Sequence, residues 1–153
     1  MLEIYHNNVP DVRKSDVDKK TLSKTIMDNL EENIIPFIQN NPQVEFMLYF
    51  PPYSIVSWGI MENCVKEIEC MKLIIERLLV YPNVSIYFYQ GEQKIITDLD
   101  HYMDTIHFDT VVANKIIDYM ADDTNKLTSE NYESGLDEFG EVVMKFDYSS
   151  LAE

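Results

Sequence analysis

Two histidines lie in one acidic segment of the chain, and each follows an aspartate at a spacing of three. The segment covers residues 97–109, TDLDHYMDTIHFD, and it pairs Asp104 with His107 and Asp98 with His101. A carboxylate at this spacing can turn back and accept the proton of the imidazole Nδ1, which leaves Nε2 facing outward as a general base. The spacing is compatible with a catalytic acid–base pair, but by itself it favours a solvated acidic loop with incidental histidines.

A nucleophile for such a base is not evident from the residue pattern. Ser54 and Ser57 follow an apolar run in the segment FPPYSIVSW. Neither stands in a G-x-S-x-G elbow, and no G-D-S occurs in the sequence. A serine beside two prolines is typical of a turn or a helix cap, so we expect a capping role here.

The remaining residue patterns lead us to expect neither a metal nor a cofactor. The sequence has no H-E-x-x-H motif and no EF-hand register. Its four glycines never approach phosphate-loop spacing, which disfavours flavodoxin-like nucleotide binding. Cys64 and Cys70 stand six residues apart, which suits neither a metal pair nor a redox C-x-x-C motif. We expect two reduced thiols in or near the core.

The excess of acidic residues limits the kinds of molecule that the protein can bind. With 12 Lys and Arg against 27 Asp and Glu, the formal net charge of the 153 residues is −15. Such an acidic surface repels phosphate backbones and anionic lipid, so binding to nucleic acid or to a membrane surface is disfavoured. The sequence contains neither a signal-peptide pattern nor an apolar run long enough to span a membrane. As written, the chain is expected in the cytoplasm.

The elements that must position these side chains alternate between helix and strand. Apolar residues recur at steps of three and four in three segments, and two short apolar runs bounded by turn residues read as strands. In the first helix we expect an apolar stripe that includes Ile34 and Phe37, and a kink at Pro36. The expected elements are a helix from Thr21 to about 38, a buried strand at 44–50, a helix at 58–80, a strand at 84–89, a loop at 95–106, a helix at 109–120 and a short edge strand at 142–146.

This order predicts a small α/β domain with an incomplete sheet. Two strands joined by a helix favour a parallel pair with a right-handed crossover. Parallel sheets are covered on both faces and are rarely this small, so further strands are expected from the chain ends or from another chain. We therefore predict one incomplete α/β domain, a partial three-layer sandwich with a small parallel sheet. Residues 1–20 form a lead-in segment, 21–121 the α/β core and 122–153 a C-terminal extension.

Three segments together carry a resemblance to a known family. They are FPPYSIVSW, YPNVSIYFYQ and DLDHYMDTIHFDTVVANKII, of which the last is the most specific. Their order resembles the C-terminal half of the SGNH/GDSL-hydrolase-like family of bacteria, over roughly residues 31–148. Members of that family act in acyl transfer or deacylation of cell-envelope carbohydrate. The resemblance implies the C-terminal portion of a flavodoxin-like SGNH fold.

The resemblance also assigns roles to the histidine segment. The family's D-x-x-H block supplies the acid and the base of a Ser–His–Asp triad, and it matches Asp104 and His107. Tyr102 and Phe108 fill the aromatic positions of that block, which favours this pair over Asp98 and His101. The family's G-D-S block and its oxyanion-hole residues are not found here, so the chain is expected to be inactive alone.

Two functions follow from this resemblance. The first is the C-terminal part of an esterase or acyltransferase that acts on acylated carbohydrate, in a full-length relative located at the cell envelope. The alternative is a non-catalytic remnant or a binding and assembly module on the same scaffold. In both cases an incomplete sheet predicts a homo-oligomer or association with a missing N-terminal part.

Overall fold

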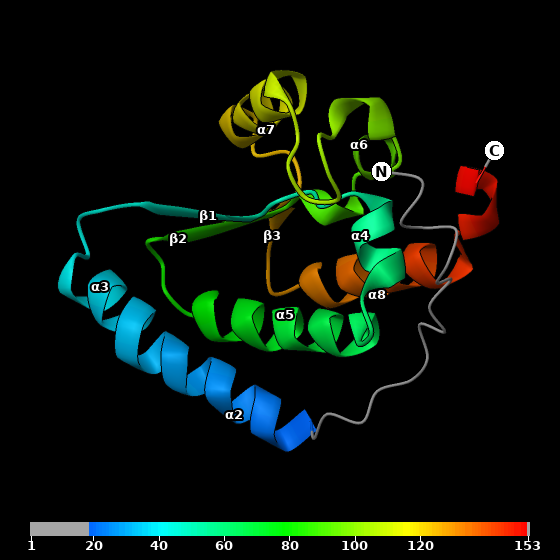
Figure 1. The fold of residues 1–153 in the computed structure, drawn as a ribbon. Coiled ribbons are helices and arrows are strands. Elements are labelled where there is room, and N and C mark those ends of the chain that lie inside the picture. The colour runs from blue at the N-terminus through cyan, green and yellow to red at the C-terminus, as the bar shows by residue number, and fades with distance from the viewer. Residues whose placement is uncertain (1–18, 153) are drawn as a thin grey trace.

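The computed structural model describes residues 19–152, so most of the predicted lead-in lies outside the described residues. The chain forms a mixed α/β fold with one three-stranded sheet (Figure 1). In chain order the elements are α2 (Lys19–Asn29), the π-helical turn η1 (Leu30–Ile34), α3 (Ile35–Asn40), β1 (Phe46–Phe50), α4 (Ile55–Ile60), α5 (Cys64–Leu78), β2 (Val84–Phe88), the 3₁₀ turn η2 (Tyr89–Gly91), α6 (Gln93–Ile96), the 3₁₀ turn η3 (Leu99–His101), α7 (Thr110–Ala121), β3 (Lys126–Leu127), α8 (Tyr132–Lys145) and the 3₁₀ turn η4 (Tyr148–Ala152).

The central pair of strands confirms the predicted strand–helix–strand unit. β1 and β2 are adjacent and parallel, in a register that runs from Phe46 opposite Val84 to Phe50 opposite Phe88. A third strand, β3, pairs antiparallel with the other edge of β2. The sheet is therefore mixed, and the expectation of a purely parallel sheet was wrong. A strand of two residues is too short to show a period of two, so the sequence pattern did not reveal β3.

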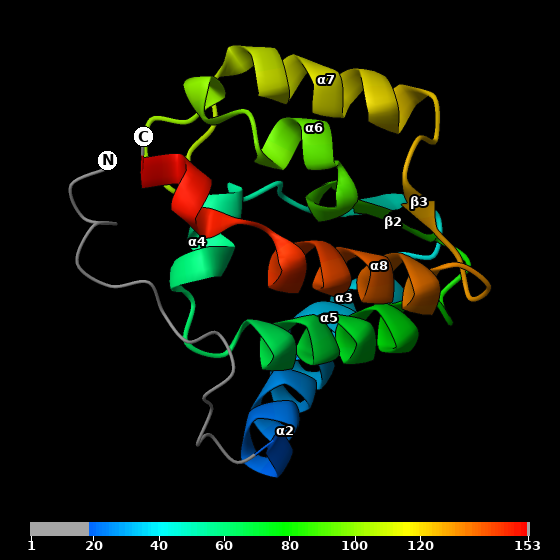
Figure 2. The same ribbon diagram turned by 90° about the vertical axis from the view of Figure 1, so that its right-hand side faces the viewer.

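Helices cover the sheet on two sides. In Figures 1 and 2, α6 and α7 lie on one side of the strands, whereas α5 and α8 lie on the other, with α2 and α3 beyond α5. Strand β2 is the middle strand, and its side chains alternate between the two layers. Ile86 and Phe88 belong to the main core, whereas Tyr87 and Tyr89 pack in a second cluster beneath α7. This is why the 84–89 run is apolar or aromatic apart from Ser85.

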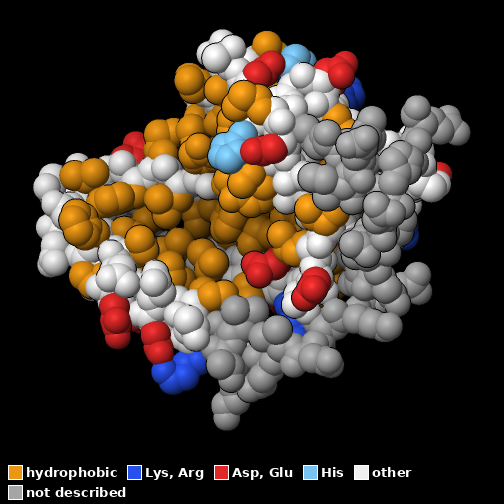
Figure 3. All heavy atoms as spheres, viewed as in Figure 1, with side chains coloured by type: hydrophobic (Ala, Val, Ile, Leu, Met, Phe, Trp, Pro, Cys, Tyr) orange, Lys and Arg blue, Asp and Glu red, His pale blue; other side chains and the backbone are white. Residues whose placement is uncertain are grey.

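Strand β1 is less buried than expected. Phe46, Leu48 and Phe50 pack against the main core, but Met47 and Tyr49 on the opposite face are 45% and 46% exposed. Figure 3 shows hydrophobic side chains gathered on the face of the molecule that carries this strand. The prediction of a buried strand was wrong for this face, because the second cluster beneath α7 covers β2 and leaves the neighbouring side chains of β1 open.

A π-helical turn replaces the predicted kink in the first helix. The Ile35 N–H donates to the carbonyl of Leu30, one residue further back than in an α-helix. Pro36 has no N–H for the carbonyl of residue 32, so the ladder is already interrupted there. The wider turn shifts the following residues around the helix axis. This shift explains why Ile34 and Phe37 are exposed, Phe37 by 69%, rather than part of the predicted apolar stripe.

The predicted helix at 58–80 consists of two helices. Met61 adopts an extended backbone with ψ of 119°, which ends α4 and redirects the chain into α5. Apolar positions continue across the break, so periodicity alone did not locate it. Val65, which continues the apolar periodicity on α5, is 47% exposed. Cys64 and Cys70 on α5 are buried and are not joined in a disulfide, as expected.

The C-terminal segment belongs to the core. The predicted edge strand at 142–146 was wrong, because residues up to Lys145 form the last turns of α8. Leu136, Phe139 and Val143 on this helix are buried in the main cluster, where Phe139 packs edge-on against Trp58 at 4.8 Å between ring centroids. The predicted loop at 95–106 also differs, since it contains the end of α6 and the turn η3.

Candidate functional site

The histidine segment folds into a short hairpin between η3 and α7. The Asp109 N–H donates to the His101 carbonyl at 2.9 Å, and the Met103 N–H donates to the His107 carbonyl at 2.9 Å. An isolated antiparallel bridge joins Tyr102 to Phe108 between these two bonds. The backbone therefore brings both histidines onto one small hairpin, which we call the histidine hairpin and define as residues 101–109.

Asp104 closes the tip of the histidine hairpin. Its Oδ1 accepts the N–H groups of Ile106 and His107, at 2.8 and 2.7 Å. An aspartate that binds the backbone two and three residues ahead makes a tight turn, which is a common local role of this residue type. The second carboxylate oxygen, Oδ2, is left for the imidazole of His107.

The predicted contact between Asp104 and His107 is present. Asp104 Oδ2 lies 2.6 Å from His107 Nδ1. The imidazole side chain is 64% exposed and that of Asp104 53% exposed. The hydrogen bond from His107, followed by the two backbone bonds, lowers the pKa of Asp104 to about 2. When the neutral imidazole donates its Nδ1 proton to the ionised Asp104, Nε2 carries the lone pair that a general base needs.

Two contacts fix the histidine hairpin to the segment that follows β1. Ser54 donates from both its N–H and its Oγ to the carbonyl of Thr105, at 3.1 and 2.7 Å. The Tyr102 hydroxyl donates to the carbonyl of Pro52 at 2.6 Å, and burial raises the pKa of this tyrosine. Thr105 lies between Asp104 and His107 in the chain, so these bonds hold the tip where the Asp–His pair is formed.

The competing pair of Asp98 and His101 does not form the predicted bond. Asp98 Oδ2 lies 3.8 Å from His101 Nε2, beyond hydrogen-bond distance, whereas His101 Nδ1 is 2.8 Å from Oδ2 of Asp109. Asp109 also caps α7, because its Oδ1 accepts the N–H groups of Val111 and Val112. The sequence pattern missed this partner, since a spacing of eight signals a contact only once the hairpin is formed.

Ser54 and Ser57 are not arranged as nucleophiles. Ser54 is fully buried, its proton is donated to Thr105, and its Oγ accepts the Ser57 N–H at 3.4 Å as the N-cap of α4. This confirms the predicted capping role of Ser54. Ser57 is buried within the first turn of α4. The hydroxyl of Ser54 therefore points to a backbone carbonyl and not to an imidazole.

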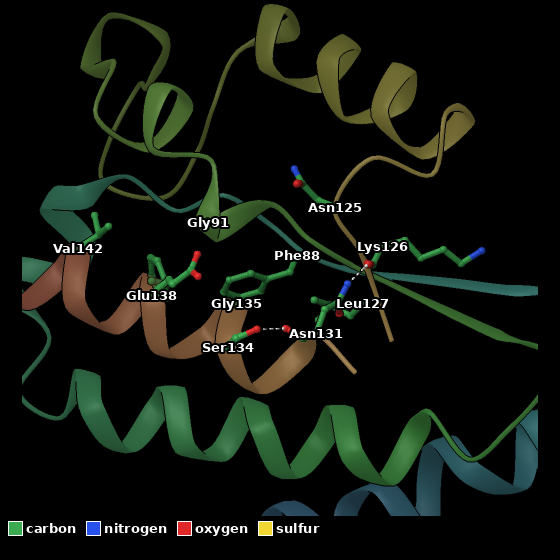
Figure 4. Close-up of a pocket in the computed structure, with 11 residues that line it drawn as sticks. Phe88, Gly91, Asn125, Lys126, Leu127, Asn131, Ser134, Gly135, Glu138 and Val142 are labelled. Atoms are coloured by element: carbon green, nitrogen blue, oxygen red, sulfur yellow. Dashed lines mark hydrogen bonds between the residues drawn. The ribbon is translucent and has the colours of Figure 1, made fainter. Parts of the chain in front are cut away.

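A separate hollow of about 320 Å³ lies between β3, α8 and the end of β2 (Figure 4). Three of its polar side chains form hydrogen bonds within the protein. Asn125 Nδ2 donates to Glu92 Oε1 at 2.7 Å, Asn131 Nδ2 to the Lys126 carbonyl at 3.1 Å, and Ser134 Oγ to the Asn131 carbonyl at 3.1 Å. None of its lining residues belongs to the histidine hairpin, so the hollow has no histidine base.

Within residues 19–152 we find no group of three or more His, Cys, Asp or Glu side chains that could hold a metal ion. In the same part of the chain no helix combines the length and the apolar character needed to cross a membrane. Searches against family models, curated proteins and solved structures produced no match for the sequence or its fold. The function must therefore be argued from the histidine hairpin itself.

Proposed function

We propose that this chain is part of an SGNH-like esterase or acyltransferase that acts on acylated cell-envelope carbohydrate. His107 would be the general base and Asp104 the residue that orients it. The observation that carries the proposal is the 2.6 Å contact between Asp104 Oδ2 and His107 Nδ1, within a hairpin tip that Ser54 and Tyr102 anchor. A base held in one tautomer with an exposed ring is what acyl transfer requires of its histidine.

The nucleophile of this reaction would come from a polypeptide segment outside this sequence. Ser54 is sealed in the protein interior and Ser57 lies in a buried helical turn. An oriented imidazole without an alcohol beside it can at most activate water, which is a weak route for ester cleavage. We therefore expect the 153-residue chain alone to hydrolyse a simple acyl ester no faster than background. An enzyme with this substrate would work at the cell envelope.

The proposal is tested first by the DNA that precedes the codon for Met1. An in-frame G-D-S block is expected there. The complete reading frame should then be expressed and treated with a fluorophosphonate, which labels activated serines covalently. His107→Gln should lower the labelling rate by about 10⁴-fold or more, as loss of a triad base does in other serine enzymes.

His101→Gln is the matched control. His101 lies in the same histidine hairpin but is assigned no chemical step, so this variant should still be labelled. A stop codon upstream without a G-D-S block would reject the proposal. Labelling that survives His107→Gln, or that is lost equally in His101→Gln, would reject the assigned roles.

A second candidate is a non-catalytic assembly module on the same scaffold. The observation that favours it is the open face of β1, where Met47 and Tyr49 remain about half exposed beside an incomplete sheet. The two candidates are separated by the same DNA. A start site directly after an upstream stop codon is expected for the module, whereas an upstream G-D-S block is expected for the enzyme.

A further inference from the structure

Strand β1 forms an open edge of the sheet. Among residues 19–152 it pairs with β2 alone, and the strand order β1-β2-β3 leaves it outermost. The backbone at such an edge presents donors and acceptors in a row, which another strand can pair with. The edge of β1 is flanked by exposed apolar side chains, so it combines the two features of a strand-addition surface.

The direction of the free peptide groups follows from the pairing with β2. The Phe46 N–H donates to the Asn83 carbonyl at 2.8 Å, on the β2 side. Peptide groups of successive residues alternate between the two edges of a strand, so Leu48 and Phe50 also face β2. Met47 and Tyr49 therefore present their N–H and C=O groups to the open edge.

We propose that this edge pairs with β1 of a second copy of the chain, antiparallel and about a two-fold axis at Leu48. In this register Met47 of one copy lies opposite Tyr49 of the other, and each such pair exchanges two backbone hydrogen bonds. All five residues of β1 are then paired. A shift of two residues in either direction would leave two residues of each strand without a partner.

The uncharged stretch around β1 is where a second copy can approach with the least repulsion. The protein carries a net charge of −15, so two copies repel each other over most approaches. Residues 46–54, FMLYFPPYS, contain no charged side chain. In the proposed register Glu45 lies opposite Pro51 of the other copy, so no like charges face each other across the pair. The dimer should therefore become stronger as added salt screens the remaining repulsion.

Sedimentation velocity tests the association on the 153-residue chain. We expect a monomer–dimer equilibrium that shifts toward the dimer with concentration and with salt. Tyr49→Lys and Met47→Lys should each weaken dimerisation by about tenfold or more, because each buries an ammonium group against an apolar neighbour. Val65→Lys on α5 is the matched control, since Val65 is 47% exposed and lies outside β1, and it should dimerise like the wild type.

The register has its own test. Two-fold-related Leu48 residues would form a non-hydrogen-bonded pair with Cα atoms about 4.5 Å apart, within disulfide range. Leu48→Cys should therefore form an intermolecular disulfide on mild oxidation. Met144→Cys, which is exposed on α8, is the matched control and should not do so efficiently, and both native cysteines are buried.

Three outcomes would overturn the proposal. A monomer at all accessible concentrations would do so, and so would a dimer that Tyr49→Lys and Val65→Lys affect equally. The third concerns hydrogen exchange at the Met47 and Tyr49 amides. Protection that does not change with concentration would mean that another segment of the same chain covers the edge, whereas the dimer requires protection that rises with concentration.

Discussion

The two histidines of the hairpin are both held through Nδ1 by an aspartate, but in different settings. His107 sits at the exposed tip, where its ring is available to a substrate. His101 is only 29% exposed at the base, where Asp109 joins it to the start of α7. The first pair is suited to chemistry at Nε2, whereas the second pair connects two elements of the fold.

The pair at the base should make stability depend on pH. The hydrogen bond that His101 donates to Asp109 raises the pKa of His101, and the same bond lowers the pKa of Asp109. The raised histidine pKa adds stability that is complete below about pH 6.5 and is lost as pH rises through the folded value. The lowered aspartate pKa adds stability that is complete above about pH 4 and is lost as pH falls through the folded value. The pair should therefore stabilise most between about pH 4 and 6.5.

His101→Gln measures this contribution. The difference in Tm between wild type and variant should be larger at about pH 5 than at about pH 8, by circular dichroism at matched ionic strength. His107→Gln serves as the comparison, because His107 is exposed at the tip and joins no second element. A difference for His101→Gln that is the same at both pH values would contradict the assigned charge pair.

At the scale of elements, α8 shows how much a helix depends on its neighbours. Its apolar residues pack on α5 and on β2, and Phe139 contacts both Trp58 and Phe88 edge-on. Gly135, in the first half of this helix, does not face a packed neighbour, because a Cβ built there meets no atom within 4 Å. This glycine lines the hollow beside β3.

Gly135→Ala should stabilise the protein by about 0.5–1 kcal/mol. Alanine loses less backbone entropy than glycine in a helix, and here the added methyl enters open space. Urea unfolding monitored by circular dichroism measures the change. In the matched variant Gly140→Ala the methyl would lie 3.5 Å from Ile68 Cδ1, an ordinary contact distance, so this variant should be stabilised as well. A loss of stability in Gly135→Ala would contradict the open space at this position.

At the scale of the whole molecule, charge opposes the compact state. With 27 acidic against 12 basic residues, the folded chain holds an excess of 15 negative charges close together at pH 7. Exposed ion pairs offset little of this repulsion, since pairs such as Lys145 with Glu141 lie in water. The main core and the second cluster beneath α7 must therefore provide most of the stability.

Salt should consequently stabilise this protein. Raising NaCl from about 20 mM to about 500 mM shortens the Debye length from roughly 20 Å to about 4 Å and screens the repulsion. We expect Tm at pH 7 to rise over this range, by differential scanning calorimetry at low protein concentration. Near the sequence pI of about 4.4 the excess charge disappears, and the rise should be much smaller. A Tm at pH 7 that falls with salt would contradict this account.

Several features could be predicted from the sequence alone, because they depend on residues that are close together in the chain. The apolar runs at 44–50 and 84–89 predicted the parallel pair β1 and β2. Each run lies between turn residues, and this signal for a strand can be read from neighbouring residues in the sequence. The Asp104–His107 contact was also predictable, since three residues in one turn decide it. The same holds for the Ser54 cap, which depends on the residues that follow it.

Other features depend on contacts between distant residues, and only the tertiary structure decided them. Strand β3 is two residues long and exists because β2 lies beside it, and residues 142–145 are helical because α8 packs as one unit on α5. Asp109 reaches His101 only after the hairpin has formed. The exposure of Met47 and Tyr49 follows from where α7 lies. A one-dimensional pattern records how apolar a residue is, but which neighbour covers it is a property of the packed molecule.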